Sequence, residues 1–213
     1  MTPPTIQRFF LISFRTLSRL GSPNKEQSEK WLEMTDSFVN RPGTMIQQVD
    51  DNDFPIGGIP REDALRFGAN FRVVHILVMN RHGEVLLQQI PSHARHPNQW
   101  GSSVAGYVEV HESYEEAAVR KLGMELGIHA QPSHLGKTSM TDGSSKKFIG
   151  VYMLHWDDPI SPNPSDYGAL CFVPVDGIDA WIRAQSAHVT PTSLHVLRFV
   201  RSVHPHLDVD SQL

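Results

Sequence analysis

Residues 106–128 constrain the possible fold of this chain more than any other segment. A strand punctuated by glycines, residues 100–110, leads directly into a predicted helix at residues 112–126, and Gly127 follows in the C-cap position. A strand that runs straight into a capped helix is typical of a domain in which helices cover a sheet.

The rest of the chain also alternates between predicted strands and predicted helices. Residues 71–79 are apolar and β-branched, and residues 84–89 return after a polar turn, which together predict a hairpin. The other strands are expected at residues 45–50, 54–59, 148–156 and 168–175, and the other helices at residues 24–39, 176–186 and 190–203. This interleaved order predicts an α/β sandwich built around one sheet.

The N-terminal segment, residues 1–40, is expected to be a helical extension, and residues 44–205 are expected to form one domain. Residues 1–25 carry four basic side chains and no acidic one, whereas the remaining residues hold 15 basic and 23 acidic side chains, a balance of −8. An arginine-rich segment with Ser and Thr and without acids is typical of an organellar targeting peptide, here a mitochondrial one. The alternative is an amphipathic helix that docks its apolar face on the domain.

Composition excludes several classes of protein. The net charge of −4 gives no basic excess of the kind that nucleic-acid binding requires. No apolar stretch reaches the roughly 18 residues of a transmembrane helix. Cys171 is the only cysteine, so the chain has no intrachain disulfide, which fits a reducing intracellular compartment. Because Cys171 lies in the apolar run 169–173, we expect it to fill the core.

Two polar segments have alternative interpretations. Asp51-Asn52-Asp53 separates the first two predicted strands, and its carboxylates could attract a cation, but Asp and Asn in a hairpin turn usually accept backbone hydrogen bonds. The pair Lys146-Lys147 precedes the strand predicted at 148–156. These lysines either contact a phosphate group or lie in a solvated turn.

Residues 106–128 resemble the Nudix box, whose pattern is G-x5-E-x7-R-E-U-x-E-E-x-G-U, with U a bulky aliphatic residue. The matching positions are Gly106, Glu112, Arg120, Leu122, Glu125, Gly127 and Ile128. Residues 45–201 also resemble one branch of the Nudix superfamily, which contains type I isopentenyl-diphosphate isomerase and bacterial Nudix hydrolases. The resemblance implies an α/β/α sandwich around a mixed β-sheet that binds a diphosphate-containing small molecule.

The resemblance also implies a metal-dependent reaction, but the box departs from the pattern at two positions. Hydrolysis of a diphosphate linkage uses divalent cations, Mg²⁺ or Mn²⁺, held by glutamates on the box helix. Lys121 and Met124 replace two of three such glutamates, and only Glu125 remains. A protonated lysine cannot coordinate a cation, and a thioether is a poor ligand for Mg²⁺. Lys121 and Glu125, four residues apart, are therefore expected to form an ion pair.

Several further residues are candidates for the site. The candidate catalytic residues are Glu125, Glu112 and Arg120, of which Glu112 and Arg120 are expected to brace the turn into the helix. Glu125 and Glu116 are the candidate ligands of a reduced metal site, although Glu116 is also spaced to pair with Arg120 on the helix surface. The candidate substrate-binding residues are Arg95, Trp100 and Gly106.

The residues next to the box glycine exclude the isomerase reaction. The isomerase has a catalytic cysteine directly before that glycine and a metal-binding histidine directly after it. This chain has Ala105 and Tyr107 at those positions. Without the acid and the metal, no group is available to protonate an alkene.

Two functions remain open. The first is a diverged hydrolase for a nucleoside diphosphate-type or similar diphosphate ester, with metal-dependent hydrolysis reduced or lost. The second is a non-catalytic Nudix-fold protein that binds a phosphorylated ligand or a partner chain, either a second copy or another protein. The substitutions at Lys121 and Met124 favour strong reduction or loss of hydrolysis.

Overall fold

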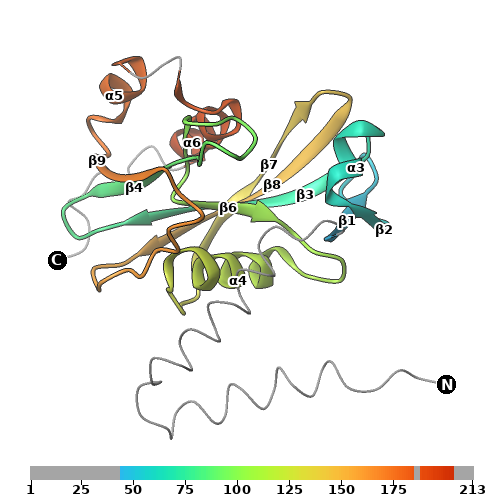
Figure 1. Cartoon of the computed structure of the whole chain (residues 1–213), viewed down its shortest axis with the longest axis horizontal. Coiled ribbons are helices and arrows are strands. Elements are labelled where there is room, and N and C mark those ends of the chain that lie inside the picture. Colours follow the sequence, from blue (N-terminus) through green and yellow to red (C-terminus); the bar gives the residue numbers. More distant parts are fainter. Residues whose placement is uncertain (1–43, 185–187, 204–213) are drawn as a thin grey trace, which may run out of the picture. The chain divides into compact units, whose positions relative to one another are not determined.

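A mixed sheet lies at the centre of the part of the chain that the computed structural model describes, residues 44–184 and 188–203 (Figure 1). The predicted N-terminal extension, residues 1–40, and its targeting segment lie outside these described residues. Within the described ranges, no helix has the length and apolar character needed to cross a membrane.

The described elements follow one another as an irregular alternation of strands and helices. The strands are β1 (Met45–Val49), β2 (Pro55–Pro60), β3 (Asn70–Met79), β4 (Glu84–Gln89), β5 (Trp100–Gly101), β6 (Val104–Tyr107), β7 (Ser133–Asp142), β8 (Ser145–His155) and β9 (Ala169–Pro174). The helices are α3 (Arg61–Arg66), α4 (Tyr114–Leu126), α5 (Ile178–Ala184) and α6 (Pro191–Val203).

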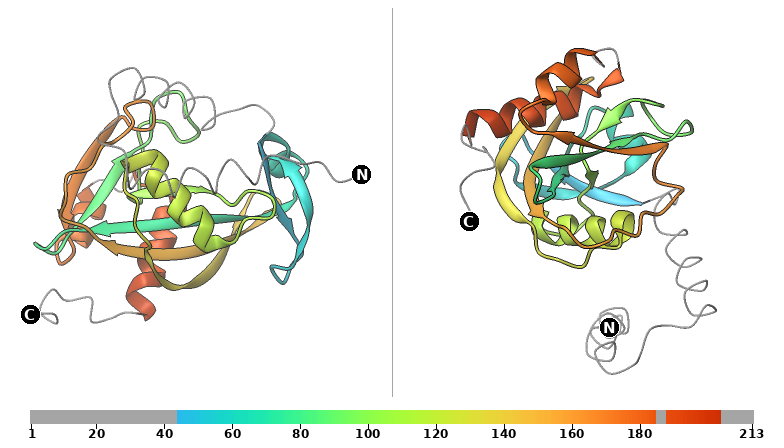
Figure 2. Two further views of the ribbon diagram at one scale, coloured as in Figure 1. Left: turned by 90° about the horizontal axis from the view of Figure 1, so that it is seen from below. Right: turned by 90° about the vertical axis from the view of Figure 1, so that its left-hand side faces the viewer.

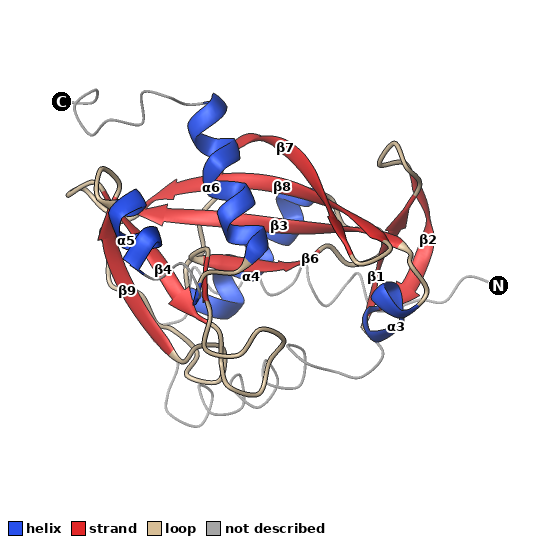
Figure 3. Cartoon of the chain, turned by 90° about the horizontal axis from the view of Figure 1, so that it is seen from above, coloured by secondary structure: helices blue, strands red, loops and turns tan. Residues whose placement is uncertain are grey.

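The central strand is β3. On one side it runs parallel to β8 along its length, from the pair Phe71–Lys147 to the pair Met79–His155. On its other side it pairs antiparallel with β1, β6 and β4 in turn. Helix α4 covers one face of this sheet, and α5 and α6 lie on the opposite face (Figures 2 and 3). The expected α/β/α sandwich around a mixed sheet is confirmed.

Side chains of β3 alternate between two cores because successive residues of a strand point to opposite faces. Val74, Ile76 and Val78 are buried in the core that includes α4. Val73 and Leu77 are buried in the core that includes α6. Each fully buried aliphatic side chain contributes about 1.5–3 kcal/mol to folding, so β3 stabilises both helical layers at once.

Most predicted elements are confirmed, with limits shifted by a few residues, but the strand predicted at 100–110 is divided. β5 pairs with β4, whereas β6 pairs with β3. Between them, the hydroxyl of Ser103 accepts the N–H of Val78 at 2.7 Å and donates to the carbonyl of Leu86 at 2.5 Å. The serine thus supplies hydrogen bonds where β3 and β4 separate, and the chain changes partner strands there.

Two further differences between the predicted and the observed structure concern the edge strands β7 and β9. β7 was not predicted, because its sequence is polar and its residues are mostly exposed or half-buried. β9 pairs with β4, and most of its residues are exposed or half-buried. Cys171, in β9, is only partly buried, so the expectation that it fills the core is only partly right.

Helix α3 was also absent from the prediction. It spans six residues after Pro60 and buries one side chain, Ala64, so it has no long apolar stripe from which a helix could be recognised.

The turn between β1 and β2 takes its backbone hydrogen bonds from Asp50. Its carboxylate accepts the N–H groups of Asn52 at 2.8 Å and Phe54 at 2.9 Å. The expectation of a hydrogen-bonded turn is therefore right for this segment. Asp53, however, turns inward with a φ of 69° and is buried.

Asp53 joins four elements of the fold. Its carboxylate contacts Arg72 Nε in β3 at 2.6 Å and Lys137 Nζ in β7 at 2.7 Å. The hydroxyl of Tyr114, the first residue of α4, donates to the same carboxylate at 3.0 Å. The hairpin β1–β2 is thus tied to β3, β7 and α4 through one buried anion.

We expect Asp53→Asn to lower the free energy of unfolding by roughly 3 kcal/mol, because it leaves the guanidinium of Arg72 buried without its counter-charge. Asn also tolerates the left-handed conformation, so the substitution removes the charge and keeps the backbone. Urea unfolding measures the change. The exposed Asp51→Asn is the control, with an expected change within about 0.5 kcal/mol. Equal effects of the two substitutions would show that Asp53 is an ordinary turn residue.

His75 is a buried polar residue of β3 on the face that α6 covers. Its Nδ1 is hydrogen-bonded to the hydroxyl of Ser102 at 2.9 Å, and the N–H of Ser102 donates to the hydroxyl of Ser193 in α6 at 3.0 Å. Burial lowers the pKa of His75 to about 3, and the charges of Lys147 and His195 act in the same direction. The imidazole is therefore neutral near pH 7.

The buried, neutral His75 predicts a loss of stability in mild acid. Its pKa in the folded chain lies below the ordinary value of 6.5, so the unfolded chain takes up the proton first as the pH falls. This group then removes about 1.4 kcal/mol of stability per pH unit between roughly pH 6 and pH 3. In His75→Asn this part of the slope should vanish. Urea unfolding at pH values from about 6.5 to 4.5 measures both slopes, and identical slopes would contradict the prediction.

Candidate functional site

Helix α4 begins with a complete capping box. The hydroxyl of Ser113 accepts the N–H of Glu116 at 3.1 Å, and the Glu116 carboxylate accepts the N–H of Ser113 at 2.8 Å. The hydrogen bond from the Ser113 N–H lowers the pKa of the Glu116 carboxyl, and the side chain of Ser113 adds to this shift. At the other end Gly127 has a φ of 68°, which confirms the predicted C-cap.

His111 lies directly before the box glutamate Glu112, at a position that usually holds glycine in a Nudix box. Its φ of 67° lies in the left-handed region, which glycine adopts freely and other residues adopt at a cost of about 1 kcal/mol. The N–H of His111 donates to the side-chain oxygen of Gln47 at 3.2 Å. His111 therefore adopts the backbone conformation that a glycine would adopt at this position, and the loop carries more backbone strain than it would with glycine.

Arg120 braces this loop, as the sequence predicts. Its Nε and Nη2 donate to the two carboxylate oxygens of Glu112 at 2.6 and 2.7 Å. Nη2 also donates to the carbonyl of Tyr107 at 3.0 Å, and Nη1 lies 3.3 Å from the carboxylate of Glu109. One guanidinium thus binds the start and the end of the loop to the middle of α4.

Lys121 and Glu125 form the ion pair that their spacing predicts. Only 12% of the Lys121 side chain and 6% of the Glu125 side chain are exposed. The stem of Lys121 lies against Gly106, where a Cβ atom would come within 2.4 Å of Lys121 Cε. Burial raises the pKa of Glu125, the charge of Lys121 opposes this shift, and the charge of Asp166 adds to it. The lysine thus lies between the box glycine and the box glutamate.

This arrangement does not fit a divalent metal ion. Glu125 is already paired, and the sulfur of Met124 lies 3.8 Å from Nη1 of Arg120. Across residues 44–184 and 188–203, no three His, Cys, Asp or Glu side chains are grouped so as to hold a metal. Mg²⁺ and Mn²⁺ require several oxygen ligands, so the donor set falls short of a Nudix metal centre.

Glu116 is not brought to Glu125. The two residues are nine positions apart on one helix, which separates them by about 13 Å along the axis and by half a turn around it. Glu116 also does not form the ion pair with Arg120 that was considered for the helix surface, because its carboxylate caps the helix. One ion therefore cannot be shared by Glu116 and Glu125 within this helix.

The loop between β8 and β9 closes over the end of α4. The N–H of Asn163 donates to the carbonyl of Glu125 at 3.1 Å, and the hydroxyl of Tyr167 donates to the same carbonyl. The N–H of Ser161 donates to the carbonyl of Leu126 at 2.8 Å. These bonds hold Glu125 in place from the backbone side.

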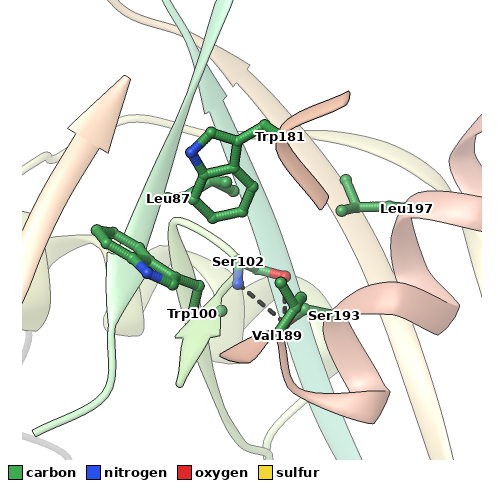
Figure 4. Close-up of a pocket in the computed structure, with 8 residues that line it drawn as sticks. Leu87, Trp100, Ser102, Trp181, Val189, Ser193 and Leu197 are labelled. Atoms are coloured by element: carbon green, nitrogen blue, oxygen red, sulfur yellow. Dashed lines mark hydrogen bonds between the residues drawn. The ribbon is translucent and has the colours of Figure 1, made fainter. Parts of the chain in front are cut away.

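Trp100 lies away from the box, on the face of the sheet that α5 and α6 cover. Its ring packs edge-to-face on Trp181 of α5, with 5.5 Å between the ring centroids. Both tryptophans line a small apolar depression together with Leu87 and Leu197 (Figure 4). The structure therefore does not bring Trp100 to Glu125 as part of one cluster.

Arg95 lies in the loop between β4 and β5, where it binds a carboxylate of the chain itself. Its guanidinium contacts both oxygens of Asp142, at 2.7 and 3.2 Å. Lys147 contacts the same carboxylate at 2.9 Å and is buried. The interpretation of Lys147 as part of a solvated turn was wrong. Two adjacent lysines look alike in sequence, and only the register of β8 turns Lys147 inward.

Residues 69–193, more than half of the chain, match the NUDIX domain family. An uncharacterised Nudix hydrolase of Pseudomonas aeruginosa is 29% identical over 156 residues, which cover 72% of this chain and 91% of that protein. Isopentenyl-diphosphate Delta-isomerase 1 of Photorhabdus laumondii is 26% identical over 152 residues, 67% of this chain and 86% of that protein.

The fold is also shared with a solved structure. A crystal structure of a protein from Deinococcus radiodurans has a TM-score of 0.63 and 26% identity, and the match covers 75% of this chain and 99% of that one. The matched domain contains the box, the central strand β3 and the core under α4. The chain therefore belongs to the Nudix family.

Proposed function

We propose that this chain is a Nudix-fold protein for a diphosphate-linked ligand of the nucleoside diphosphate type, in which metal-dependent hydrolysis is strongly reduced or lost. Family membership supports the ligand class, since relatives are named Nudix hydrolases. The rearranged box supports the change in chemistry.

One observation carries the proposal: the buried ion pair between Lys121 and Glu125. Glutamates at positions 121, 124 and 125 would together carry −3, whereas Lys121 and Glu125 sum to zero. A cation bound by Glu125 would displace the ammonium of Lys121 and leave it buried beside a second positive charge. Breaking a buried ion pair by removing one partner costs about 3–5 kcal/mol. This cost opposes metal binding in addition to the missing ligands.

The frame of the box does not depend on the substituted positions, which supports a retained binding role. Arg120 and Glu112 hold the loop, and Ser113 and Glu116 cap the helix. Both sets of bonds are made within the chain. A ligand can therefore meet a preformed loop even when the metal cluster is missing.

We expect the wild-type chain to hydrolyse little or none of a panel of nucleoside diphosphates and sugar nucleotides in Mg²⁺ or Mn²⁺. Glu125→Gln should not change this background, because no metal-bound glutamate is lost. For both proteins, a colorimetric assay measures the phosphate released from nucleoside diphosphates, and chromatography measures the nucleoside monophosphate released from sugar nucleotides. Metal-dependent turnover that Glu125→Gln abolishes would overturn the proposal and establish a working hydrolase.

Restoring the box provides the complementary test. The double variant Lys121→Glu, Met124→Glu places three carboxylates within one helical turn, so we expect it to bind Mn²⁺ at least about tenfold more tightly than the wild type. The matched control carries the same two substitutions with Glu125→Gln and should lose most of this gain. Electron paramagnetic resonance of free Mn²⁺ measures binding. Equal Mn²⁺ affinity in the wild type and the double variant would contradict the role assigned to Lys121.

A further inference from the structure

We propose that Arg95 and Lys147 form an anion-binding site on the α6 face of the sheet, with Asp142 as its internal counter-anion, and that the site takes a phosphate group without a metal ion. The inference rests on the proposed function, because it names where the phosphate of that ligand binds. It concerns a cluster that is separate from the ion pair of the box.

The β4–β5 loop, the β7–β8 hairpin and helix α6 meet at this cluster. Arg95 comes from the loop between β4 and β5, Asp142 ends β7, and Lys147 lies in β8. Arg95 and Lys147 both contact the Asp142 carboxylate, at 2.7 and 2.9 Å. The ammonium of Lys147 also donates to the hydroxyl of Thr192, in the first turn of α6, at 2.8 Å. The cluster thus presents one cation from a strand and one from a loop around one carboxylate.

The cluster is mostly buried, so its net positive charge is only weakly screened by water. Only 11% of the Lys147 side chain and 14% of the Asp142 side chain are exposed, whereas half of the Arg95 side chain is exposed. Among the described residues, Arg95 and Lys147 both form their ion pair with the same carboxylate, that of Asp142. One negative charge therefore faces two positive charges in a site that water screens poorly. The exposed guanidinium leaves a side open to an incoming anion.

The neighbouring titratable groups add no compensating negative charge. Burial and the charge of Arg95 lower the pKa of His96, and burial, Arg198 and Lys147 lower the pKa of His195. These shifts favour the neutral form of both imidazoles near pH 7. Neutral imidazoles can donate hydrogen bonds to an anion without repelling it.

A second guanidinium, that of Arg61, shares the neighbour Tyr107 with Arg95. Arg61 is 5.0 Å from the ring centroid of Tyr107, in β6. Hydrogen bonding to Asp142 raises the pKa of Arg95, and Tyr107 is close enough to contribute in the same direction. Tyr107 thus interacts with both guanidinium groups.

A phosphate group fits this charge better than the internal carboxylate does. It carries up to two negative charges and has three acceptor oxygens, whereas Asp142 supplies one charge. The planar guanidinium of Arg95 binds phosphate in the same two-pronged geometry that it uses with Asp142. We therefore expect Asp142 to compete with the ligand for Arg95 and Lys147.

This competition distinguishes the proposal from a purely structural ion-pair cluster. Isothermal titration calorimetry of the full chain in EDTA, with inorganic phosphate, pyrophosphate and a nucleoside diphosphate at constant ionic strength, measures the affinities. We expect pyrophosphate to bind at least about tenfold more weakly to Arg95→Gln and about tenfold more tightly to Asp142→Asn than to the wild type. Tighter binding of the nucleoside diphosphate than of pyrophosphate would identify the ester as the natural source of the phosphate.

Asp179→Asn is the matched control, because it removes a carboxylate from a half-exposed ion pair with Arg201. The affinity of this variant for pyrophosphate should equal that of the wild type. In thermal unfolding, Asp142→Asn should have a lower Tm without anions, and pyrophosphate should raise that Tm by more than it raises the Tm of Asp179→Asn. If Asp142→Asn does not fold, Arg95→Gln still tests the site, since its side chain is half-exposed.

Equal pyrophosphate affinity in the wild type and in Arg95→Gln would overturn the proposal. So would a folded Asp142→Asn protein that pyrophosphate stabilises no more than Asp179→Asn. Because these measurements are made in EDTA, they do not depend on metal-driven turnover. Turnover by the wild type would refute the proposed function and leave the anion site standing, whereas absent anion binding would refute the site alone.

Discussion

The two-residue period of β3 is the constraint on which the rest of the structure depends. Because its side chains point alternately to opposite faces, a single strand supports the core under α4 and the core under α6. The same division separates the two polar sites. The box residues Lys121 and Glu125 lie on the α4 side, whereas Lys147 and Arg95 cluster towards α6. Each site is therefore free to change its charges without altering the other helical layer.

The box illustrates how a scaffold can persist while its electrostatics change. The loop and the helix start are stabilised by Arg120 with Glu112 and by the capping residue Ser113, and none of these bonds needs a metal. Lys121 stands where the box pattern has a glutamate. Its ammonium pairs directly with Glu125 and neutralises the charge that a metal ion would otherwise neutralise. With Lys121 and Met124 at positions where the box pattern has glutamates, the loop and the helix start keep their hydrogen bonds. The buried Lys121–Glu125 pair opposes the binding of a cation at Glu125.

The local sequence correctly predicted the structure wherever interacting residues lie within a few positions of each other. The helix after residue 113, its end at Gly127 and the Lys121–Glu125 pair all follow from spacing along one helix. It was a poor guide at Asp53, which shares a turn with residues of identical chemistry but is buried against β3 and β7. It also failed for β7, whose polar residues form a strand only because β8 offers them a paired edge.

By itself, the sequence determined the family, the layered α/β architecture and the departure from the box pattern at Lys121 and Met124, because each depends on residue identity at fixed spacing. Only the tertiary structure decided which charges meet between segments. It buried Asp53 against Arg72 and Lys137, and it joined Arg95 to Lys147 through Asp142. The physical reason is that ion pairing falls steeply with distance and burial, and both are set by strand register and chain packing.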